Sequence, residues 1–299
     1  MSFTVTDNAG NPVDPSTLDR LAFQVAGPTI DYSFSWPPAQ LEDARKATSG
    51  LTSYSYSFTN TLPSNATGTF AIGAEAYRSV SYPGPIVGQS FSVRETAFNP
   101  VFYFSVDGSK VAPRRQIISQ DNCNVCHQSL ALHGGIRKNT EYCVLCHNAK
   151  ATDAEVRPSG QGPPETINFR TMVHRIHMGV KLDSTYSVAG FNGSPINFNG
   201  VRYPADPRDC SKCHVGTTYT LPLSVGVLSV DAPAFFYSPL QPAASACLGC
   251  HNSVEAAVHA YLNTTSFGES CEVCHAEGAA FAVTKVHTRD KVWGPEDAR

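Results

Sequence analysis

The first 122 residues of this 299-residue chain contain neither cysteine nor histidine, although the whole chain holds ten of each. This part therefore lacks the side chains that most often bind transition metals, and it cannot form a disulfide. Charged residues are also scarce, at 16% of the chain. No basic run indicates a nucleic-acid partner, and no apolar run is long enough to cross a bilayer. The recognisable chemistry must lie after residue 122.

The later part of the chain contains five copies of the pentapeptide C-x-x-C-H, and these account for every cysteine. This pentapeptide is the attachment signature of a c-type haem: the two thiols add to the two vinyl groups, and the histidine ligates the iron. The predicted covalent attachment sites are Cys123, Cys126, Cys143, Cys146, Cys210, Cys213, Cys247, Cys250, Cys271 and Cys274. The predicted proximal iron ligands are His127, His147, His214, His251 and His275. The sequence therefore predicts five c-type haems.

Two other uses of these cysteines were weighed. A disulfide framework would have to be built entirely from C-x-x-C loops, which are redox-active motifs more often than structural links. Ten cysteines and ten histidines could in number form five Cys2His2 zinc sites. Zinc binding, however, gives no reason for a histidine to follow the second cysteine directly in all five pairs. The haem interpretation explains that adjacency.

The five remaining histidines match the five iron positions that the motifs leave open. All of them lie in the haem-bearing region, and we predict them as distal ligands: His133, His174, His177, His259 and His287. Ligation of one iron by one of the three methionines, Met1, Met172 or Met178, stays open as an alternative, although the ten histidines make it unnecessary. Two histidines on one iron give a lower potential than a histidine and a methionine.

The cofactors change the expected charge and location of the chain. The formal charge of −3 becomes about −8 with five ferric haems and about −13 after reduction, which also disfavours nucleic acid as a partner. The start MSFTVTDNAG lacks the basic and apolar segments of a secretory signal. Because c-type haems are attached outside the bacterial cytoplasm, we expect a processed or truncated sequence whose export signal is missing.

Residues 1–112 predict an antiparallel β-barrel or sandwich domain of Greek-key type, because short alternating segments are separated by turn residues. IDYSFSW is expected to place Ile30, Tyr32, Phe34 and Trp36 on one face. A helix-like insert is expected near Leu41–Ala47, and a linker at Val111–Ile118. The expected strands include Leu21–Val25, Tyr54–Phe58, Thr69–Tyr77, Phe91–Thr96 and Val101–Val106.

Residues 113–299 predict a loop-rich, mostly helical pentahaem domain. NFRTMVHRIHMG is the clearest helix, and its His174 and His177 are spaced to lie on one side, where they can serve two neighbouring irons. His133 and His259 lie too close to His127 and His251 to fold back onto the same iron, so we expect each to serve a different motif. Residues 184–207, rich in glycine, asparagine and proline, predict a long surface loop.

Several segments together resemble the outer-membrane multihaem cytochromes of metal-reducing bacteria, the OmcA/MtrC type. These are NPVFYFSVDGS with RRQ, CNVCHQSLALHGGIR with YCVLCHN, MVHRIHMG, YPADPRDCSKCHVG with LPL, and ESCEVCHAEG with KVH. Such proteins alternate β-barrel and pentahaem domains and usually carry ten haems. This chain matches one half, the C-terminal one, and lacks the extra cysteine pair of some family β domains.

The resemblance implies transfer of respiratory electrons at the outer-membrane surface. Its implied acceptors are metal oxides, ferric chelates, flavins and humic material, and its implied partners are other multihaem cytochromes or an outer-membrane conduit. Two alternatives remain: a periplasmic electron shuttle or storage protein, and a multihaem reductase of a small anion. The reductase needs an iron with an open position, whereas ten histidines fill ten axial positions. We therefore expect an electron-transfer protein with no catalytic residues of its own.

Overall fold

The computed structural model describes residues 1–37, 41–50 and 53–288. The chain divides into two compact units. The first unit comprises Met1–Arg114 and Cys126–Cys146, and the second comprises Arg115–Val125 and His147–Arg299. Each unit is described separately below.

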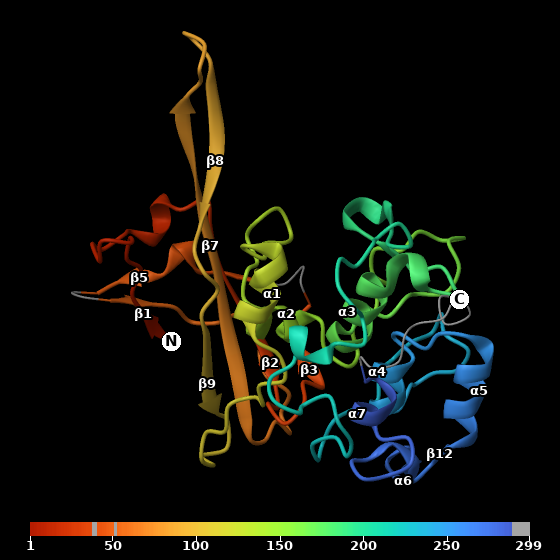
Figure 1. The fold of residues 1–299 in the computed structure, drawn as a ribbon. Coiled ribbons are helices and arrows are strands. Elements are labelled where there is room, and N and C mark those ends of the chain that lie inside the picture. Colours follow the sequence, from red (N-terminus) through yellow and green to blue (C-terminus); the bar gives the residue numbers. More distant parts are fainter. Residues whose placement is uncertain (38–40, 51–52, 289–299) are drawn as a thin grey trace. The chain divides into compact units, whose positions relative to one another are not determined.

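The first unit is built on an open, six-stranded antiparallel sheet (Figure 1). Four strands follow the order β3-β2-β7-β8, while β4 also pairs with β2 and β9 also pairs with β7. The strands are β2 (Arg20–Gly27), β3 (Phe34–Ser35), β4 (Glu42–Asp43), β7 (Thr69–Pro83), β8 (Ser90–Thr96) and β9 (Val101–Ser105). The register pairs Phe23 with Ala74 and Val25 with Ile72. The expected antiparallel β fold is present as an open, half-barrel sheet.

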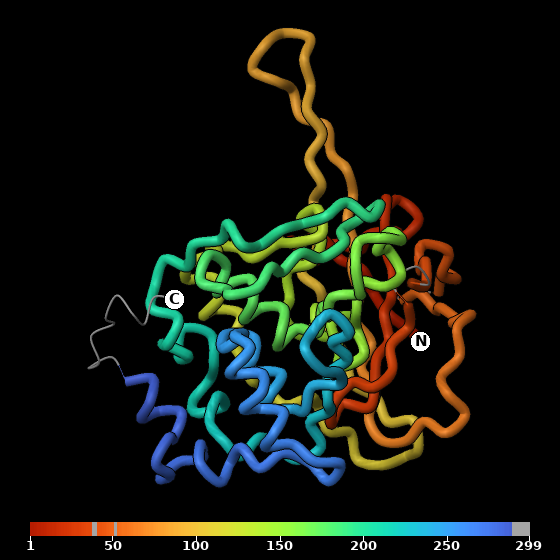
Figure 2. The backbone as a smooth tube through the Cα atoms, turned by 90° about the vertical axis from the view of Figure 1, so that its right-hand side faces the viewer, coloured from red at the N-terminus to blue at the C-terminus, as the bar shows by residue number. Residues whose placement is uncertain are grey.

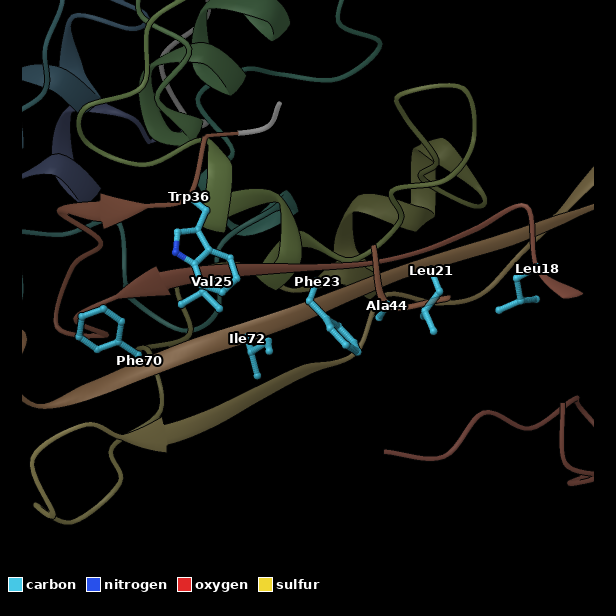
Figure 3. Close-up of a cluster of buried hydrophobic side chains, with 8 residues drawn as sticks. All are labelled: Leu18, Leu21, Phe23, Val25, Trp36, Ala44, Phe70 and Ile72. Atoms are coloured by element: carbon cyan, nitrogen blue, oxygen red, sulfur yellow. The ribbon is translucent and has the colours of Figure 1, made fainter. Parts of the chain in front are cut away.

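The core of this unit lies on one face of β2 and β7, where Phe23, Trp36 and Phe70 are buried together (Figure 3). A second, three-stranded sheet supplies partners for this cluster, and it consists of β1 (Ser2–Phe3), β6 (Tyr54–Ser55) and β5 (Thr48–Ser49). The Phe3 ring meets the Phe23 ring edge-on with centroids 5.3 Å apart. Edge-on aromatic pairs add to the stabilisation that burial provides. The unit therefore has an apolar core of its own.

The opposite face of β2 and β7 is covered by helix α2 (Thr140–Cys146). Tyr142 and Leu145 are fully buried there with Ala71. Gly73 makes this approach possible, because a Cβ at that position would collide with Tyr142 and Leu145. A segment that holds a haem motif is thus part of the core of the β unit.

Two local expectations for this unit were wrong. Ile30, Tyr32, Phe34 and Trp36 do not share a face: Ile30 is 57% exposed, Tyr32 is buried in the α2 cluster, and Trp36 is buried in the other cluster. The expected helix near Leu41–Ala47 is only one 3-10 turn, η3 (Ala44–Lys46), between β4 and β5. Residues 38–40 and 51–52, which begin this insert and the expected Tyr54 strand, lie outside the described residues.

Strand β7 is longer than the sequence indicates. Its pairing with β2 ends at Tyr77, while its pairing with β8 continues to Pro83. The result is a two-stranded hairpin that extends well beyond the sheet that carries it, as both views show (Figure 1 and Figure 2).

The second unit is rich in loops, as expected, but its helices are short, and the longest one described has ten residues. The helices are α3 (Phe169–Met178), α4 (Pro242–Cys247), α5 (Val254–Leu262), α6 (Glu272–His275) and α7 (Val283–Val286), and α1 (Gln120–His127) begins in this unit. Two small hairpins are also present: β10 (Ser187–Ala189) with β11 (Pro195–Asn197), and β12 (Thr264–Thr265) with β13 (Gly268–Glu269). The expectation of a mostly helical domain is not supported.

Helix α3 forms where the sequence predicts it, and its ends have clear causes. The Asn168 side chain accepts a hydrogen bond from the Thr171 N–H, and Gly179 ends the helix at a φ of 46°. Asparagine favours the N-cap, and glycine tolerates the left-handed region. Among the described residues, no helix is long and apolar enough to cross a membrane.

The segment 184–207 is not simply a surface loop. It forms the β10–β11 hairpin, and Tyr186 at its start is fully buried. The Tyr186 hydroxyl donates to the Thr166 carbonyl at 2.8 Å. The glycine, asparagine and proline content predicted the turns correctly, but it did not predict that Tyr186 is buried.

Candidate haem sites

Each C-x-x-C-H motif lies on or at the end of a short helical turn. The first is on α1, the second lies at the end of α2, and the third begins on η6 (Cys210–Lys212). The fourth begins at the last residue of α4, and the fifth is on α6. In the last three motifs, the histidine N–H donates to the carbonyl of the first cysteine: 2.9 Å for His214, 2.8 Å for His251 and 3.0 Å for His275. One closed turn holds the two thiols and the imidazole in a fixed relation.

Three motif histidines each face one lone histidine. The ring centroids are 6.2 Å apart for His174 and His214. They are 6.0 Å apart for His251 and His287. They are 6.2 Å apart for His259 and His275. Each pair thus joins one predicted proximal ligand to one predicted distal ligand.

This spacing suits two imidazoles on opposite sides of one metal ion. A metal–nitrogen bond of about 2 Å on each side, and about 1.1 Å from each nitrogen to its ring centre, give a centroid separation of about 6.2 Å. Ordinary ring contacts also fall in this range. They would not, however, select one motif histidine and one lone histidine three times.

The hydrogen bonds of the rings leave the other nitrogen available for a metal. The Nδ1 of His174 lies 3.2 Å from the Ala246 carbonyl oxygen. The Nδ1 of His275 lies 3.0 Å from the Phe281 carbonyl oxygen, and the Nδ1 of His287 lies 2.9 Å from the Val283 carbonyl oxygen. A carbonyl can only accept, so Nδ1 must donate and Nε2 keeps its lone pair. Such bonds commonly orient metal-binding histidines.

His214 shows the same arrangement through a hydroxyl. Its Nδ1 lies 3.2 Å from the Thr218 Oγ1, and that hydroxyl donates to the Ile117 carbonyl at 2.7 Å. Because the hydroxyl proton is already used, the oxygen accepts from His214. Thr218 therefore fixes the tautomer that a metal ligand needs.

Burial favours the neutral form of these histidines. It lowers the pKa of His174 to about 4, with a smaller contribution from His214. It also lowers the pKa of His214 and of His251. A neutral imidazole is the form that ligates a metal.

Burial disfavours the thiolate form of several of the cysteines. None of the ten is in a disulfide. Burial raises the pKa of the Cys250 thiol and of the Cys271 thiol to about 12, and it raises the pKa of Cys146 and Cys247 as well. Reactive dithiols have a lowered pKa instead. Among the described residues, no three His, Cys, Asp or Glu side chains converge on a point that could hold a metal ion. The donor set therefore fits attachment at the cysteines and axial ligation by histidine pairs.

The four other predicted ligands have local positions as follows. His127 ends α1, and His147 follows α2 with its Nδ1 2.8 Å from the Ile167 carbonyl oxygen. His177 lies on α3 with its Nδ1 2.8 Å from the Val173 carbonyl oxygen. His133 has a φ of 52°, in the left-handed region.

Helix α3 is fixed by contacts with α4, the helix that carries the fourth motif. The Thr171 hydroxyl donates to the Ser245 carbonyl at 3.0 Å. Gly249, inside the fourth motif, lets His174 approach, because a Cβ there would lie 2.7 Å from the His174 Cβ. The motif does not predict this role, since any residue can occupy that place in C-x-x-C-H.

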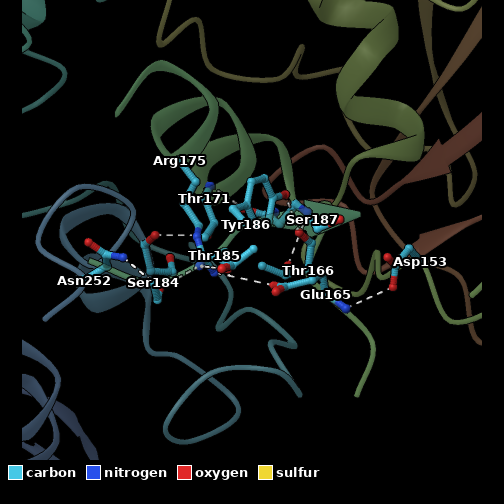
Figure 4. A network of polar contacts seen from close by, with 12 residues as sticks. Asp153, Glu165, Thr166, Thr171, Arg175, Ser184, Thr185, Tyr186, Ser187 and Asn252 are labelled. Atoms are coloured by element: carbon cyan, nitrogen blue, oxygen red, sulfur yellow. Dashed lines mark hydrogen bonds and ion pairs between the residues drawn. The ribbon is translucent and has the colours of Figure 1, made fainter. Parts of the chain in front are cut away.

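A buried polar network supports the same helix and was missed by sequence reasoning (Figure 4). Arg175, between His174 and His177, is 3% exposed and stacks on the Tyr186 ring at 4.5 Å. Its guanidinium donates to the Ser184 hydroxyl at 3.2 Å. The Asn252 amide, next to His251, donates to the same hydroxyl at 2.8 Å. Burial raises the pKa of Glu165 near Arg175, and Arg175 opposes that shift.

Comparisons with known proteins show which proteins this chain resembles. The family model for domains II and IV of MtrC/MtrF-like outer membrane cytochromes matches residues 115–288. The multiheme cytochrome MtrC of Shewanella baltica (strain OS185) is 28% identical over 207 residues, which cover 67% of this chain and 28% of that protein. The crystal structure of MtrC from Shewanella baltica OS185 aligns with a TM-score of 0.50 and 13% identity, over 91% of this chain and 48% of that chain.

The structural alignment supports the fold, and this chain spans about half of the solved MtrC chain and a smaller part of the curated relative. The family model covers more than half of this chain and includes all five C-x-x-C-H motifs. C-type haems therefore follow from the family together with the motifs. The chain belongs to the MtrC/MtrF-like family of multihaem outer-membrane c-type cytochromes.

Proposed function

We propose that this chain binds five c-type haems, each held by two axial histidines, and acts as an electron conduit. The observation that carries the proposal is the pairing of one motif histidine with one lone histidine at about 6 Å, seen three times. Bound haem would supply reversible one-electron transfer between ferric and ferrous iron. The protein's part is to hold both axial positions and so keep small molecules off the metal.

The proposed ligand pairs are His174 with His214, His251 with His287, and His259 with His275. The lone histidines that remain are His133 and His177, and the motif histidines that remain are His127 and His147. His133 lies only six residues after His127 in the sequence. For this reason we propose that His133 serves a motif other than the first, and that His177 serves a different haem from His174.

The first test is the number and attachment of the haems. The intact mass should exceed that of the polypeptide by five haems, and acid with organic solvent should release none, because thioether bonds are covalent. Fewer attached haems would remove one motif from the proposal. Haem released by the solvent would contradict covalent attachment altogether.

The second test is ligation, using two histidines on one helix. His174→Ala should open the haem held at the third motif, and His177→Ala should open a different one. Each variant should show one high-spin ferric signal and bind about one carbon monoxide per chain, whereas the unaltered protein should show low-spin iron only. If both variants opened the same haem, the assignment of the helix to two irons would be wrong.

The proposed function is extracellular electron transfer to ferric chelates, metal oxides, flavins or partner cytochromes, at the outer-membrane surface. Within it, residues 113–299 would form the pentahaem domain, and residues 1–112 would position it against a partner. Because the reduced chain carries about −13 charges, transfer to an anionic ferric chelate should become faster as salt screens the repulsion.

Stopped-flow reoxidation of the reduced protein distinguishes this function from the small-anion reductase. The conduit should react with several ferric chelates and flavins at rates that follow driving force. Turnover of nitrite with saturation kinetics, together with inertness toward ferric chelates, would support the reductase instead. A shuttle in the periplasm would give the same rates, so localisation of the tagged protein on intact cells decides between that alternative and the surface conduit.

A further inference from the structure

The hairpin that β7 and β8 form beyond the main sheet has a surface that the proposed electron conduit does not use. We call residues 78–95 the arm. Its strands pair from Arg78 with Glu95 to Pro83 with Ser90. The turn between them is closed by hydrogen bonds from the Gly84 N–H to the Gln89 carbonyl at 2.8 Å and from the Gln89 N–H to the Ile86 carbonyl at 3.0 Å. A two-stranded ribbon is marginally stable alone in water, so its exposed apolar groups call for an explanation.

The two faces of the arm differ in chemistry. Cross-strand partners share a face, and the face alternates along each strand. One face therefore carries the pair Val80–Val93 and the pair Tyr82–Phe91, whose rings stack with centroids 5.9 Å apart. The other face carries Ser81–Ser92. The arm is an amphipathic ribbon.

The apolar side chains of the arm are exposed, and they reach a maximum at its tip. Val87 is 102% exposed and Ile86 is 60% exposed, while Tyr82, Phe91 and Val93 are exposed as well. No charged residue occurs from position 79 to position 93. Charge returns at the base, where Arg78 pairs with Glu95 at 2.7 Å and the Arg94 guanidinium lies over the Tyr77 ring. The base lies about 20 Å from the tip, at about 3.3 Å per strand residue.

We propose that the arm inserts its tip and its apolar face into the headgroup–acyl boundary of a lipid bilayer. An uncharged aliphatic tip followed by aromatic rings and then by arginines matches the polarity gradient of that boundary. Pro83 and Pro85 carry no N–H, and the turn satisfies the N–H groups of Gly84 and Gln89 internally, so these four positions expose no backbone donor that would lose water on insertion. The serine face stays toward headgroups and water, which makes the arm an interfacial anchor and not a spanning element.

A second copy of the chain fits this surface less well. The exposed apolar side chains of the arm offer on the order of 500 Å², below the roughly 800 Å² per partner of a stable protein interface. The uncharged stretch also offers no ion pair to fix an orientation between two copies. A bilayer requires neither a large matched area nor a fixed orientation, since its apolar interior accepts any side-chain geometry.

Flotation of the haem-loaded full chain with neutral phosphatidylcholine vesicles tests the proposal. The protein should float with the vesicles at 0.05 M and at 0.5 M salt alike, about equally, because insertion does not depend on charge. Ile86→Asp with Val87→Asp should lower the partition coefficient at least about tenfold, since charge must then enter the boundary. Ser81→Asp with Ser90→Asp is the matched control. It adds the same charge to the other face and should leave partition within about twofold of the unaltered protein.

A second variant tests whether a loss of vesicle binding could come only from unfolding of the hairpin. Val87→Trp should bind at least as well as the unaltered chain, and its fluorescence should be quenched by brominated phosphatidylcholine. Failure of the unaltered chain to float would overturn the proposal. Equal losses of vesicle partition in both aspartate variants would also overturn it. So would a dimer, detected by sedimentation, that dissociates in the Ile86→Asp, Val87→Asp variant. Haem content and reoxidation rates should be unchanged in every variant, so failure here would not affect the proposed electron transfer.

Discussion

The two units of this protein obtain their stability in different ways. The first unit buries Phe23, Val25 and Phe70 in one continuous cluster between its own strands. The second unit has a small cluster around Leu240 and Leu248, while many of its large apolar side chains are exposed in the polypeptide. The exposed ones include Val254, Val258, Leu262, Val273 and Phe281, close in sequence to predicted ligands. We therefore expect bound haem to complete the core of the second unit, whereas the first unit has a core formed by its own side chains.

The largest expected effect is the loss of haem. If the chain is produced without haem attachment, the second unit should lose its structure, because apolar surface meant for the rings would face water. Hydrogen exchange should show that α3 and α5 are unprotected, whereas β2 and the first half of β7 stay protected. Protected amides in α3 without haem would show that the polypeptide alone forms this core, and the contrast between the units would fail.

The second-largest effect on stability is expected when the chain is cut at residue 112. Residues 1–112 alone should fold as a strand-rich domain but should be less stable than in the whole chain, because Tyr142 and Leu145 come from 126–146 and are both buried. Removing a buried side chain of this size costs about 2–5 kcal/mol. Urea unfolding followed by circular dichroism measures the difference. A fragment as stable as the β unit of the whole chain would show that packing of α2 on the sheet does not stabilise that unit.

Glu75→Gln should destabilise the first unit by about 3–5 kcal/mol, as is typical when one partner of a buried ion pair is removed. The buried Glu75 carboxylate accepts from Arg20, from Arg137 at 2.8 Å and from the Tyr142 hydroxyl at 2.9 Å. Glu95→Gln is the matched control, because its pair with Arg78 is exposed, and it should change little. Similar unfolding midpoints for both variants would contradict the importance of the buried network.

The smallest effect concerns pH. Hydrogen bonds from Asn60 and Tyr56 outweigh burial and hold the pKa of Glu42 below its ordinary value of 4.5. The pKa of Glu75 is also lowered, because Arg137 and Arg20 outweigh its burial. A carboxyl with a lowered pKa stabilises the folded state above its unfolded pKa, and that contribution is lost as the pH falls through the folded pKa. The first unit should therefore weaken below about pH 4.5, and Glu42→Gln should flatten this dependence. A steeper loss in the variant would contradict this cause.

The parts of the structure that were predicted correctly depend on local signals. Strand β7 and strand β9 begin at Thr69 and Val101, as their alternating residues indicate. Helix α3 begins and ends where Asn168 and Gly179 place it. Alternation, caps and turn residues act over a few positions, so they can be read without knowing the rest of the chain.

The predictions that failed depend on distant partners. Tyr32 is buried against Tyr142, which lies far along the sequence, and the expectation of one shared face for IDYSFSW could not include that partner. Tyr186 is buried at the start of a segment whose composition is typical of an exposed loop. Arg175 was missed because an arginine on a short amphipathic helix is usually solvated, and only its burial beside Tyr186 shows its role.

The sequence by itself determined the chemistry of this protein, because haem attachment needs only five adjacent residues and C-x-x-C-H occurs five times. It also determined how many histidines are available as second axial ligands of the haem irons. Only the tertiary structure decided which histidines meet: His174 faces His214 and His259 faces His275, and nothing in the local sequence joins them. The reason is physical, since attachment is a property of one helical turn, whereas an axial pair exists only where packing brings two separate turns to about 6 Å from each other.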